Sequence, residues 1–295
     1  MLDFLLIGAQ KSASTFLQNC LAEHPQLQMP KGETRAFEDP HYDEESVGQL
    51  LALPASGNSR VKHGIKRPDY LARPEVPERV ARHAPDARLI VVLRDPVPRA
   101  VSAYYHYVRL GFVPLEKPDA AFAQILDGTM ETTYPRAAEI VDFGLYGQHL
   151  RRWLGYFSRD RLLVLLQNEV VADPLTQVRL AYEFLDVDPH YVPKGLAAWS
   201  NTSVYSPWRL RLLRSRNRRR FSYTSGLERR EPRRSNVFDT AWWASVSAMD
   251  RYVFARLDAR PMPALAPDLT ARLRHAYDDD STLLEDIVGE PLPWR

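Results

Sequence analysis

The chain has 295 residues, 45% of them hydrophobic, which is enough to bury one large core, and we expect a single domain over residues 1–295. Its single cysteine excludes a disulfide framework and any multi-thiolate zinc site, and Cys20 is expected to be a core thiol. No apolar run is long enough for a signal peptide or a membrane span. With Met1 taken as the natural start, these features predict a cytoplasmic protein without a transmembrane segment.

Strands and helices alternate along the chain. Three short, uniformly apolar runs predict buried parallel strands: Phe4–Ile7, Leu89–Leu93 and Leu162–Leu166. Four stretches have helical periodicity: 14–24, 97–109, 145–157 and 175–185. The last sixty residues also favour helices, and turn residues at 25–60 and 110–120 indicate long active-site loops. The alternation predicts an α/β fold of three layers, P-loop-like, with a central, mainly parallel sheet flanked by helices.

The segment "FLLIGAQKSASTFL" changes from apolar to small polar residues after Gly8. An apolar strand is followed by Gly8, by small polar residues around Lys11, and by a helix that starts near Ser14. This order aims backbone NH groups at an anion. A Walker motif would need a glycine and a lysine where Ala13 and Ser14 stand, so that only Thr15 matches. Lys11 is therefore a candidate cation beside a phosphate-like group, and an ordinary turn with an exposed lysine is the alternative.

The segment "RLIVVLRDPVPRAVSAYYHY" repeats the pattern of a buried strand that passes into a helix. Arg94 follows the carboxyl end of the strand, and Ser102 lies in the first turns of the helix. Ligands of open α/β sheets bind at this edge, so both side chains can face the loop after the first strand. Two neighbouring anion sites suit a ligand with two separated phosphates. The alternative is a surface ion pair of Arg94 with Asp95 or Asp86.

Together these two motifs resemble those of the sulfotransferases that use 3′-phosphoadenosine 5′-phosphosulfate (PAPS), in particular the carbohydrate and heparan-type branch and its bacterial relatives. "GAQKSASTFL" resembles the family's 5′-phosphosulfate loop, and "VLRDPVPRAVSAY" resembles its 3′-phosphate site. Further segments follow in the family's order: "HPQLQMPKGETRAFED", "GIKRPDYL", "GLYGQHLRRWLGYFSRDRLLVLLQNEVVADP", "FLDVDP" and "YDDDSTLLEDIVGEPLPW". The chain departs from the family where Ser12, Ala13 and Ser14 replace a Gly-Thr run, and where "NEVV" replaces an acidic pair.

The resemblance implies a set of site residues. The 5′-phosphosulfate would be bound by Lys11, Ser12, Ala13, Ser14, Thr15 and Phe16, and the 3′-phosphate by Arg94 and Ser102. Lys11 would face the leaving oxygen, Glu33 would be the general base, and Lys66 would be a second lysine near the transferred group. Alternative bases lie nearby: Glu38, Asp39 and His41. Adenine contacts are expected near 201–205.

Positive charge is concentrated in one segment. The net charge is only +2, but Arg209–Arg234 contains eleven arginines against two glutamates. We expect this segment to be a mobile insertion that contacts an acidic acceptor, another polyanion or an anionic membrane face, or that covers the bound donor. A merely solvated loop is the alternative. The folded context argues against a nucleic-acid partner.

The expected function is sulfuryl transfer from PAPS, with release of 3′-phosphoadenosine 5′-phosphate (PAP), to a hydroxyl of a carbohydrate, glycolipid or other small molecule. No metal is expected, because lysines, arginine and helix ends supply the positive charge. A metal site at Asp278–Asp280 is the alternative, but His275 and Glu285 fit no metal-loop spacing. Two other functions stay open: a P-loop kinase that uses ATP and Mg²⁺, and a noncatalytic module that binds nucleotides or polyanions.

Overall fold

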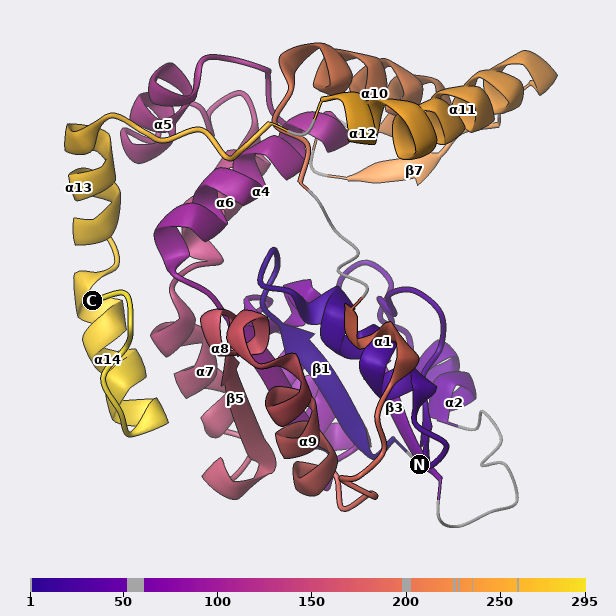
Figure 1. Cartoon of the computed structure of the whole chain (residues 1–295), viewed down its shortest axis with the longest axis vertical. Coiled ribbons are helices and arrows are strands. Elements are labelled where there is room, and N and C mark those ends of the chain that lie inside the picture. Colours follow the sequence, from indigo (N-terminus) through magenta and orange to yellow (C-terminus); the bar gives the residue numbers. More distant parts are fainter. Residues whose placement is uncertain are drawn as a thin grey trace. The chain divides into compact units, whose positions relative to one another are not determined.

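The computed structural model divides the chain into two compact units (Figure 1). It describes the following residues: 2–51, 61–197, 203–224, 227, 229–234, 236–258 and 260–295. The first unit is made of Met1–Asp95, Leu145–Asn201 and Asp279–Arg295, and the second of Pro96–Gly144 and Thr202–Asp278. That the two units together form the expected single domain stays a prediction.

The first unit is built on a parallel sheet. Its described strands are β1 (Phe4–Gly8), β2 (Leu27–Gln28), β3 (Lys62–Lys66), β4 (Arg88–Leu93) and β5 (Leu162–Leu166). They pair in the order β2-β3-β1-β4-β5, and every pairing is parallel. The three strands predicted from the sequence are β1, β4 and β5. The mainly parallel sheet predicted from the sequence is therefore confirmed.

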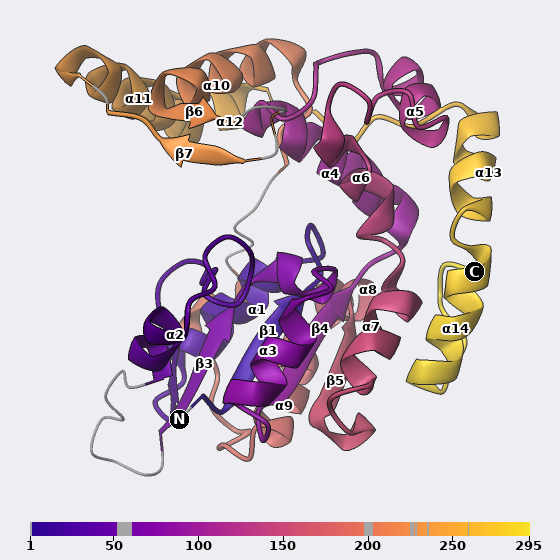
Figure 2. The same ribbon diagram turned by 180° about the vertical axis from the view of Figure 1, so that it is seen from behind.

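Helices cover both faces of this sheet (Figures 1 and 2). The helices of this unit are α1 (Ser14–Glu23), α2 (Glu44–Leu51), α3 (Val76–His83), α7 (Tyr146–Leu154), α8 (Gln167–Ala172), α9 (Pro174–Phe184) and α14 (Asp278–Val288). One core cluster joins the sheet to α1 and α9, and the other joins it to α3 and α7. The unit therefore has the three layers expected of an α/β fold.

Alternation along β1 explains why the predicted strands are apolar throughout. Phe4 and Leu6 belong to the cluster with α1 and α9, whereas Leu5 and Ile7 belong to the cluster with α3 and α7. Successive side chains point to opposite faces of a strand, and here both faces are buried. Cys20 on α1 is fully buried in the first of these clusters, which confirms the core thiol.

Gly64 on β3 leaves space for the side chain of Phe4 on the neighbouring strand. A Cβ atom added at Gly64 would lie 2.1 Å from Cζ of Phe4 on the neighbouring strand. Backbone of β1 and β3 is paired in parallel at these same two residues, so the ring of Phe4 occupies the space above the glycine. A larger residue at position 64 would displace a core aromatic ring.

The second unit is mainly helical. Its described helices are α4 (Pro96–Leu110), α5 (Pro118–Leu126), α6 (Glu139–Asp142), α10 (Pro207–Arg220), α11 (Val237–Met249), α12 (Ala255–Leu257) and α13 (Pro267–His275). A π-helical segment, Asp250–Phe254, connects α11 to α12. Strands β6 (Phe221–Tyr223) and β7 (Arg230–Pro232) form an antiparallel pair. No helix in the described part of the chain is long and apolar enough to cross a membrane.

Most of the described residues of the arginine-rich segment lie in a helix or a strand. It contributes most of α10 together with β6 and β7. The side chain of Asn217 donates a 2.7 Å hydrogen bond to the carbonyl of Arg109 on α4, and the hydroxyl of Tyr223 donates one of 2.6 Å to the carbonyl of Leu110. These contacts tie the segment to α4, so the segment is not an irregular insertion. Its mobility stays a prediction.

Two expectations about local structure are corrected. The stretch 25–60 was expected to be a long loop, but its described part contains β2 and α2. The helix expected over 145–157 ends at Leu154, because Gly155 follows and Phe157 turns into the core beyond the helix end. The helix boundaries at α1, α4 and α9 agree with the sequence to within a residue at each end.

Candidate functional site

The loop between β1 and α1 has an unusual backbone. Lys11 and Ala13 both have left-handed backbone angles, with φ of 68° and 72°. Residues with a Cβ adopt this region at a cost of about 1 kcal/mol or more, and such conformations gather at functional sites. Between them Ser12 is fully buried, and its Oγ has no hydrogen-bond partner among the described residues. The loop therefore holds a buried hydroxyl that can still accept or donate a hydrogen bond.

Helix α1 begins directly after this loop. Its N-cap residue, Ala13, provides no side-chain cap to the first turn. Four NH groups at a helix start lack partners within the helix, and the helix dipole adds partial positive charge there. The side chain of Phe16 packs into the sheet core, so any contact of this residue with a ligand would have to come from its backbone. The predicted contacts of Ser14 and Phe16 with the donor stay predictions.

The two sequence motifs of the first unit are neighbours. Strands β1 and β4 pair directly, so the loop after β1 and the end of β4 lie at one edge of the sheet. Nη1 of Arg94 donates a long hydrogen bond of 3.4 Å to the carbonyl of Lys11. The alternative partner Asp86 instead accepts from Arg161, at 2.9 Å. Arg94 therefore lies against the loop that the sequence identified as an anion site.

Ser102 belongs to the second unit. It is buried on α4, and its Oγ lies 2.9 Å from the Oγ of Ser203. Its shared role with Arg94 at a 3′-phosphate stays a prediction. Of the stretch expected near adenine, residues 201 and 202 lie outside the described residues. In its described part, the ring of Tyr205 packs edge-on against Tyr105, with the ring centroids 5.2 Å apart.

Lys66 links three parts of the first unit. It ends β3 with its side chain only 2% exposed, and its Nζ donates a 2.7 Å hydrogen bond to Oγ1 of Thr15 in α1. The same Nζ lies 3.6 Å from Oε1 of Glu33. Burial lowers the pKa of Lys66, while the negative charge of Glu33 opposes this effect. Two of the predicted catalytic residues are thus in direct contact beside the start of α1.

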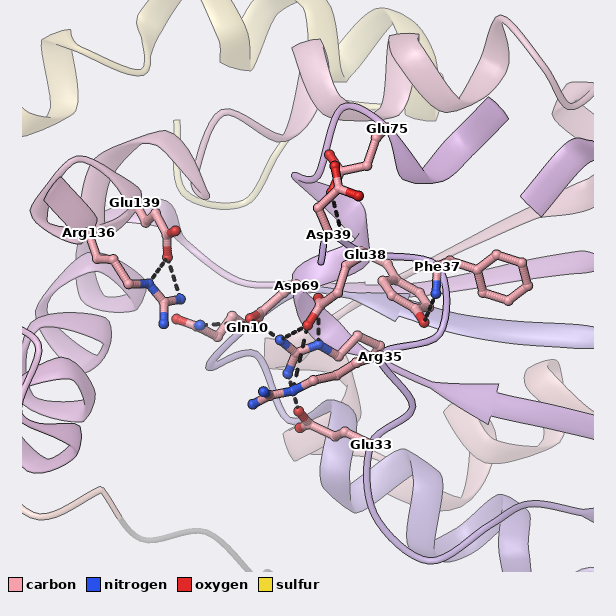
Figure 3. Close-up of polar contacts among 12 residues, drawn as sticks. Gln10, Glu33, Arg35, Phe37, Glu38, Asp39, Asp69, Glu75, Arg136 and Glu139 are labelled. Carbon is pink, nitrogen blue, oxygen red and sulfur yellow. Dashed lines mark hydrogen bonds and ion pairs between the residues drawn. The ribbon is translucent and has the colours of Figure 1, made fainter. Parts of the chain in front are cut away.

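Arg67, which the sequence analysis did not single out, binds the carboxylates of Glu33, Glu38 and Asp69, which are labelled in Figure 3. Its Nε and Nη2 donate to the two oxygens of Glu38, at 2.9 and 2.7 Å, and its Nη1 donates to Glu33 at 2.7 Å. Nη2 also lies 2.8 Å from Asp69, which accepts a 3.1 Å hydrogen bond from Gln10. One buried guanidinium therefore fixes three carboxylates at once.

The electrostatics of Arg67 follow from this arrangement. Burial alone would lower its pKa, but the charges and hydrogen bonds of Asp69, Glu38 and Glu33 outweigh burial and raise it. The guanidinium is therefore a permanent cation within the cluster. It holds Glu33 in place from one side while Lys66 holds it from the other.

The carboxylates of this loop differ in accessibility. The side chain of Glu33 is 40% exposed, whereas that of Glu38 is 7% exposed and has both oxygens engaged by Arg67. Asp39 pairs with Arg79 at 3.0 Å, on the outside of the loop. Among the four candidate bases, His41 is exposed, and Glu33 is the one in contact with Lys66. This geometry favours Glu33 for contact with a ligand and Glu38 for a structural role.

Of the acidic residues at 278–280, Asp280 contacts the start of a helix. The carboxylate of Asp280 accepts hydrogen bonds from the backbone NH groups of Gly147 and Gln148, at 2.9 and 2.8 Å, at the start of α7. Asp278 instead contacts His275, at 3.1 Å. In the described residues, no group of three or more His, Cys, Asp or Glu side chains is arranged to hold a metal ion. Asp280 is therefore a helix cap.

The model of the sulfotransferase domain family matches residues 2–216. The chain is 28% identical over 191 residues to heparan sulfate glucosamine 3-O-sulfotransferase 3A1 of Mus musculus, covering 61% of this chain and 44% of that protein. It is 32% identical over 200 residues to bifunctional heparan sulfate N-deacetylase/N-sulfotransferase 4 of Mus musculus, covering 64% of this chain and 22% of that protein. The chain thus spans less than half the length of these two relatives.

A solved structure agrees with these matches. A sulfotransferase from Alicyclobacillus acidocaldarius superposes with a TM-score of 0.66, over 99% of this chain and 97% of that chain. At 20% identity this likeness shows a shared fold. The family model matches well over half of the chain, and it does so over the residues that carry both sequence motifs. The chain therefore belongs to the sulfotransferase family.

Proposed function

We propose that the protein transfers a sulfuryl group from PAPS to a hydroxyl of a carbohydrate or glycolipid acceptor. The observation that carries this proposal is the position of Lys66, whose ammonium contacts both Thr15 at the start of α1 and the carboxylate of Glu33. A cation, a helix start and an accessible carboxylate are the groups that such a transfer needs. The two mouse relatives are named for heparan sulfate, which supports a carbohydrate as acceptor.

The loop after β1 fits a phosphate-like group. The hydroxyl of Ser12 is buried without a partner in the described residues, and α1 begins without a side-chain cap. In this proposal the residues from Lys11 to Thr15 bind the 5′-phosphosulfate, and Arg94 and Ser102 bind the 3′-phosphate. When bound, PAPS supplies a sulfuryl group attached to a phosphate that leaves with growing negative charge.

The protein's own residues would then have three tasks. Glu33 accepts the proton of the acceptor hydroxyl, and Arg67 and Lys66 hold its carboxylate in one orientation. The ammonium groups of Lys11 and Lys66 supply positive charge where negative charge develops, which stabilises most when water is excluded. The low exposure of Lys66 fits this requirement. Thr15 orients the Lys66 ammonium by accepting its hydrogen bond.

Calorimetry with adenosine 3′,5′-bisphosphate tests the donor assignment. We expect the whole chain to bind this nucleotide more tightly than Mg²⁺-ATP, and Arg94→Ala to weaken binding by about tenfold or more because one charge-assisted contact is lost. Arg88→Ala is the matched control, because Arg88 begins the strand that Arg94 follows and pairs with Asp186 instead. Tight binding of Mg²⁺-ATP without binding of the bisphosphate would instead favour the kinase alternative.

An acceptor screen tests the reaction itself. PAPS and a panel of neutral and acidic oligosaccharides and glycolipids are incubated with the protein, and products are examined by mass spectrometry for the mass of an added sulfate. The reaction should proceed after treatment with EDTA, because the proposed positive charges come from side chains. Donor binding without sulfation of any hydroxyl-bearing acceptor would speak for the noncatalytic alternative.

A further inference from the structure

Helix α11 of the second unit carries an apolar stripe. We give this name to Phe238, Trp242, Met249, Tyr252 and Val253, which lie on α11 and the π-helical segment after it. Their spacing of three, four and seven residues places them on one side of a helix. All five are exposed, from 39% for Trp242 to 84% for Phe238. Large apolar side chains gathered in this way mark a contact surface rather than ordinary surface.

Helix α11 packs on α10, and Figures 1 and 2 show the two helices side by side. Asp250 accepts a 2.9 Å hydrogen bond from Arg209, and Ser247 accepts one of 3.0 Å from Arg216. Val246 is the buried residue of α11. The stripe therefore lies beside the contact with α10. Trp242, at its border, is contacted by Arg219 of α10, and the other four side chains are at least 42% exposed.

A basic pocket lies beside the stripe. It is open, has a volume of about 580 Å³, and is lined by side chains of α10, α11 and the segments around them: Leu115, Arg211, Arg214, Ser215, Arg218, Arg219, Arg233 and Asp239. Of its five arginines, only Arg219 has a carboxylate in the lining as a partner, Asp239 at 3.7 Å. Burial, and then repulsion by Arg218, lowers the pKa of Arg214. Positive charge thus exceeds negative charge in this pocket.

The stripe and the pocket meet at one side chain. The guanidinium of Arg219 lines the pocket and also lies 5.1 Å from the ring centroid of Trp242 in the stripe. Apolar and aromatic groups next to arginines are the composition of helices that lie at the boundary between lipid headgroups and acyl chains. We propose that this face of the second unit docks on an anionic phospholipid bilayer, with the stripe at the acyl boundary and the pocket arginines on the headgroup phosphates.

The charge and the exposed apolar side chains together favour an anionic bilayer over two other partners, a second copy of the chain and a soluble polyanionic glycan. A second copy of the chain could cover the stripe, but a symmetric contact would bring two arginine-rich surfaces together, which is unfavourable. A soluble polyanionic glycan would satisfy the arginines but would leave five large apolar side chains in water. Anionic lipid satisfies both features, because it presents phosphates directly above an apolar layer.

Vesicle co-sedimentation of the whole chain tests the proposal. We expect binding to vesicles of phosphatidylglycerol and phosphatidylcholine in equal parts, weak binding to phosphatidylcholine alone, and loss of binding as salt is raised. Phe238→Gln should lower the partition coefficient about tenfold, and Arg211→Gln and Arg218→Gln about fivefold each. Matched controls are Val171→Gln, at a half-exposed valine of α8, and Arg151→Gln, at an exposed arginine of α7, both of which should bind like the original chain.

Circular dichroism of each variant establishes that the substitutions leave the fold intact, as expected for exposed side chains. The following results would overturn the proposal. They are equal binding to neutral and anionic vesicles, equal losses in the control variants, and sedimentation velocity that shows a dimer abolished by Phe238→Gln with no vesicle binding. Binding of dextran sulfate without binding to vesicles would equally overturn it, in favour of a soluble polyanion. The readout is binding alone, so it does not depend on the proposed sulfuryl transfer.

Discussion

Lys66 donates a 2.7 Å hydrogen bond to Thr15, and this contact joins the end of β3 to the first turn of α1. The lysine is buried, and burial lowers its pKa. A buried ammonium is costly unless it has partners, and here they are the threonine hydroxyl and the carboxylate of Glu33. A lysine kept in such a position, beside an uncapped helix start, points to a ligand that carries negative charge.

Replacing Lys66 should lower the rate of catalysis. For Lys66→Met we expect kcat to fall by about 10²-fold or more, because a preorganised positive charge near the leaving group is removed. Lys62→Met is a control on the same strand, where the lysine pairs with Asp186 near the surface and should be dispensable. The measurement is sulfate transfer under saturating donor. Equal kcat values for the two variants would exclude the assigned role.

Replacing Glu33 should separate binding from turnover. Glu33→Gln keeps the shape of the side chain but removes the base, so kcat should fall by at least ~10²-fold. The dissociation constant for adenosine 3′,5′-bisphosphate, measured by calorimetry, should stay within about twofold of the original value. Asp39→Asn is the control, because that carboxylate faces Arg79. A Glu33→Gln variant with full turnover would assign the base to another residue.

Replacing Arg67 should destabilise the first unit. Arg67→Met leaves the buried carboxylates of Glu38 and Asp69 without their cation, and we expect the free energy of unfolding to fall by about 3–5 kcal/mol. Urea denaturation followed by circular dichroism gives this value. The control Arg82→Met removes an exposed ion pair to Glu78 on α3 and should cost about 1 kcal/mol or less. Similar losses for both variants would contradict the structural role of Arg67.

The rate at which the Cys20 thiol is alkylated should distinguish the folded from the unfolded chain. Burial, followed by the charge of Glu23, raises its pKa from 9.0 to about 12. Because the folded pKa lies above the unfolded value, the stabilising contribution of the neutral thiol is present below pH 9.0 and is lost as the pH rises toward 12. At pH 9.0 iodoacetamide should modify the native chain roughly 10²-fold or more slowly than the urea-denatured chain. Intact mass measures the adduct, and equal labelling rates would show that the thiol is accessible.

The strands that the sequence predicts are those buried on both faces. β1, β4 and β5 are apolar throughout because helices cover them on each side. Strand β3 has the sequence "KHGIK", with charged ends and a glycine, and it was not predicted although Gly64–Lys66 pair with β1. Its glycine is required by Phe4 on the neighbouring strand, a contact that periodicity cannot reveal.

Residues of the candidate site could be predicted only where a local sequence pattern or the family resemblance identified them. Lys11 and Arg94 follow strands at an edge where ligands bind, so position alone indicated them. The role of Lys66 came from the resemblance. Arg67 was missed, because its pairing with Glu38 depends on tertiary packing between residues 29 apart in the sequence. An arginine directly after a strand and close to an aspartate was the signal that could have found it.

The capping of α7 by Asp280 has a consequence for how the protein is made. The first unit contains Asp279–Arg295, and Leu284 and Leu292 from this stretch join the core that also holds α7. The ribosome therefore synthesises the whole second unit before Asp279–Arg295, which completes the first unit, emerges. Until then α7 lacks the cap from Asp280 and part of the core is incomplete, so chaperone binding and aggregation compete with folding.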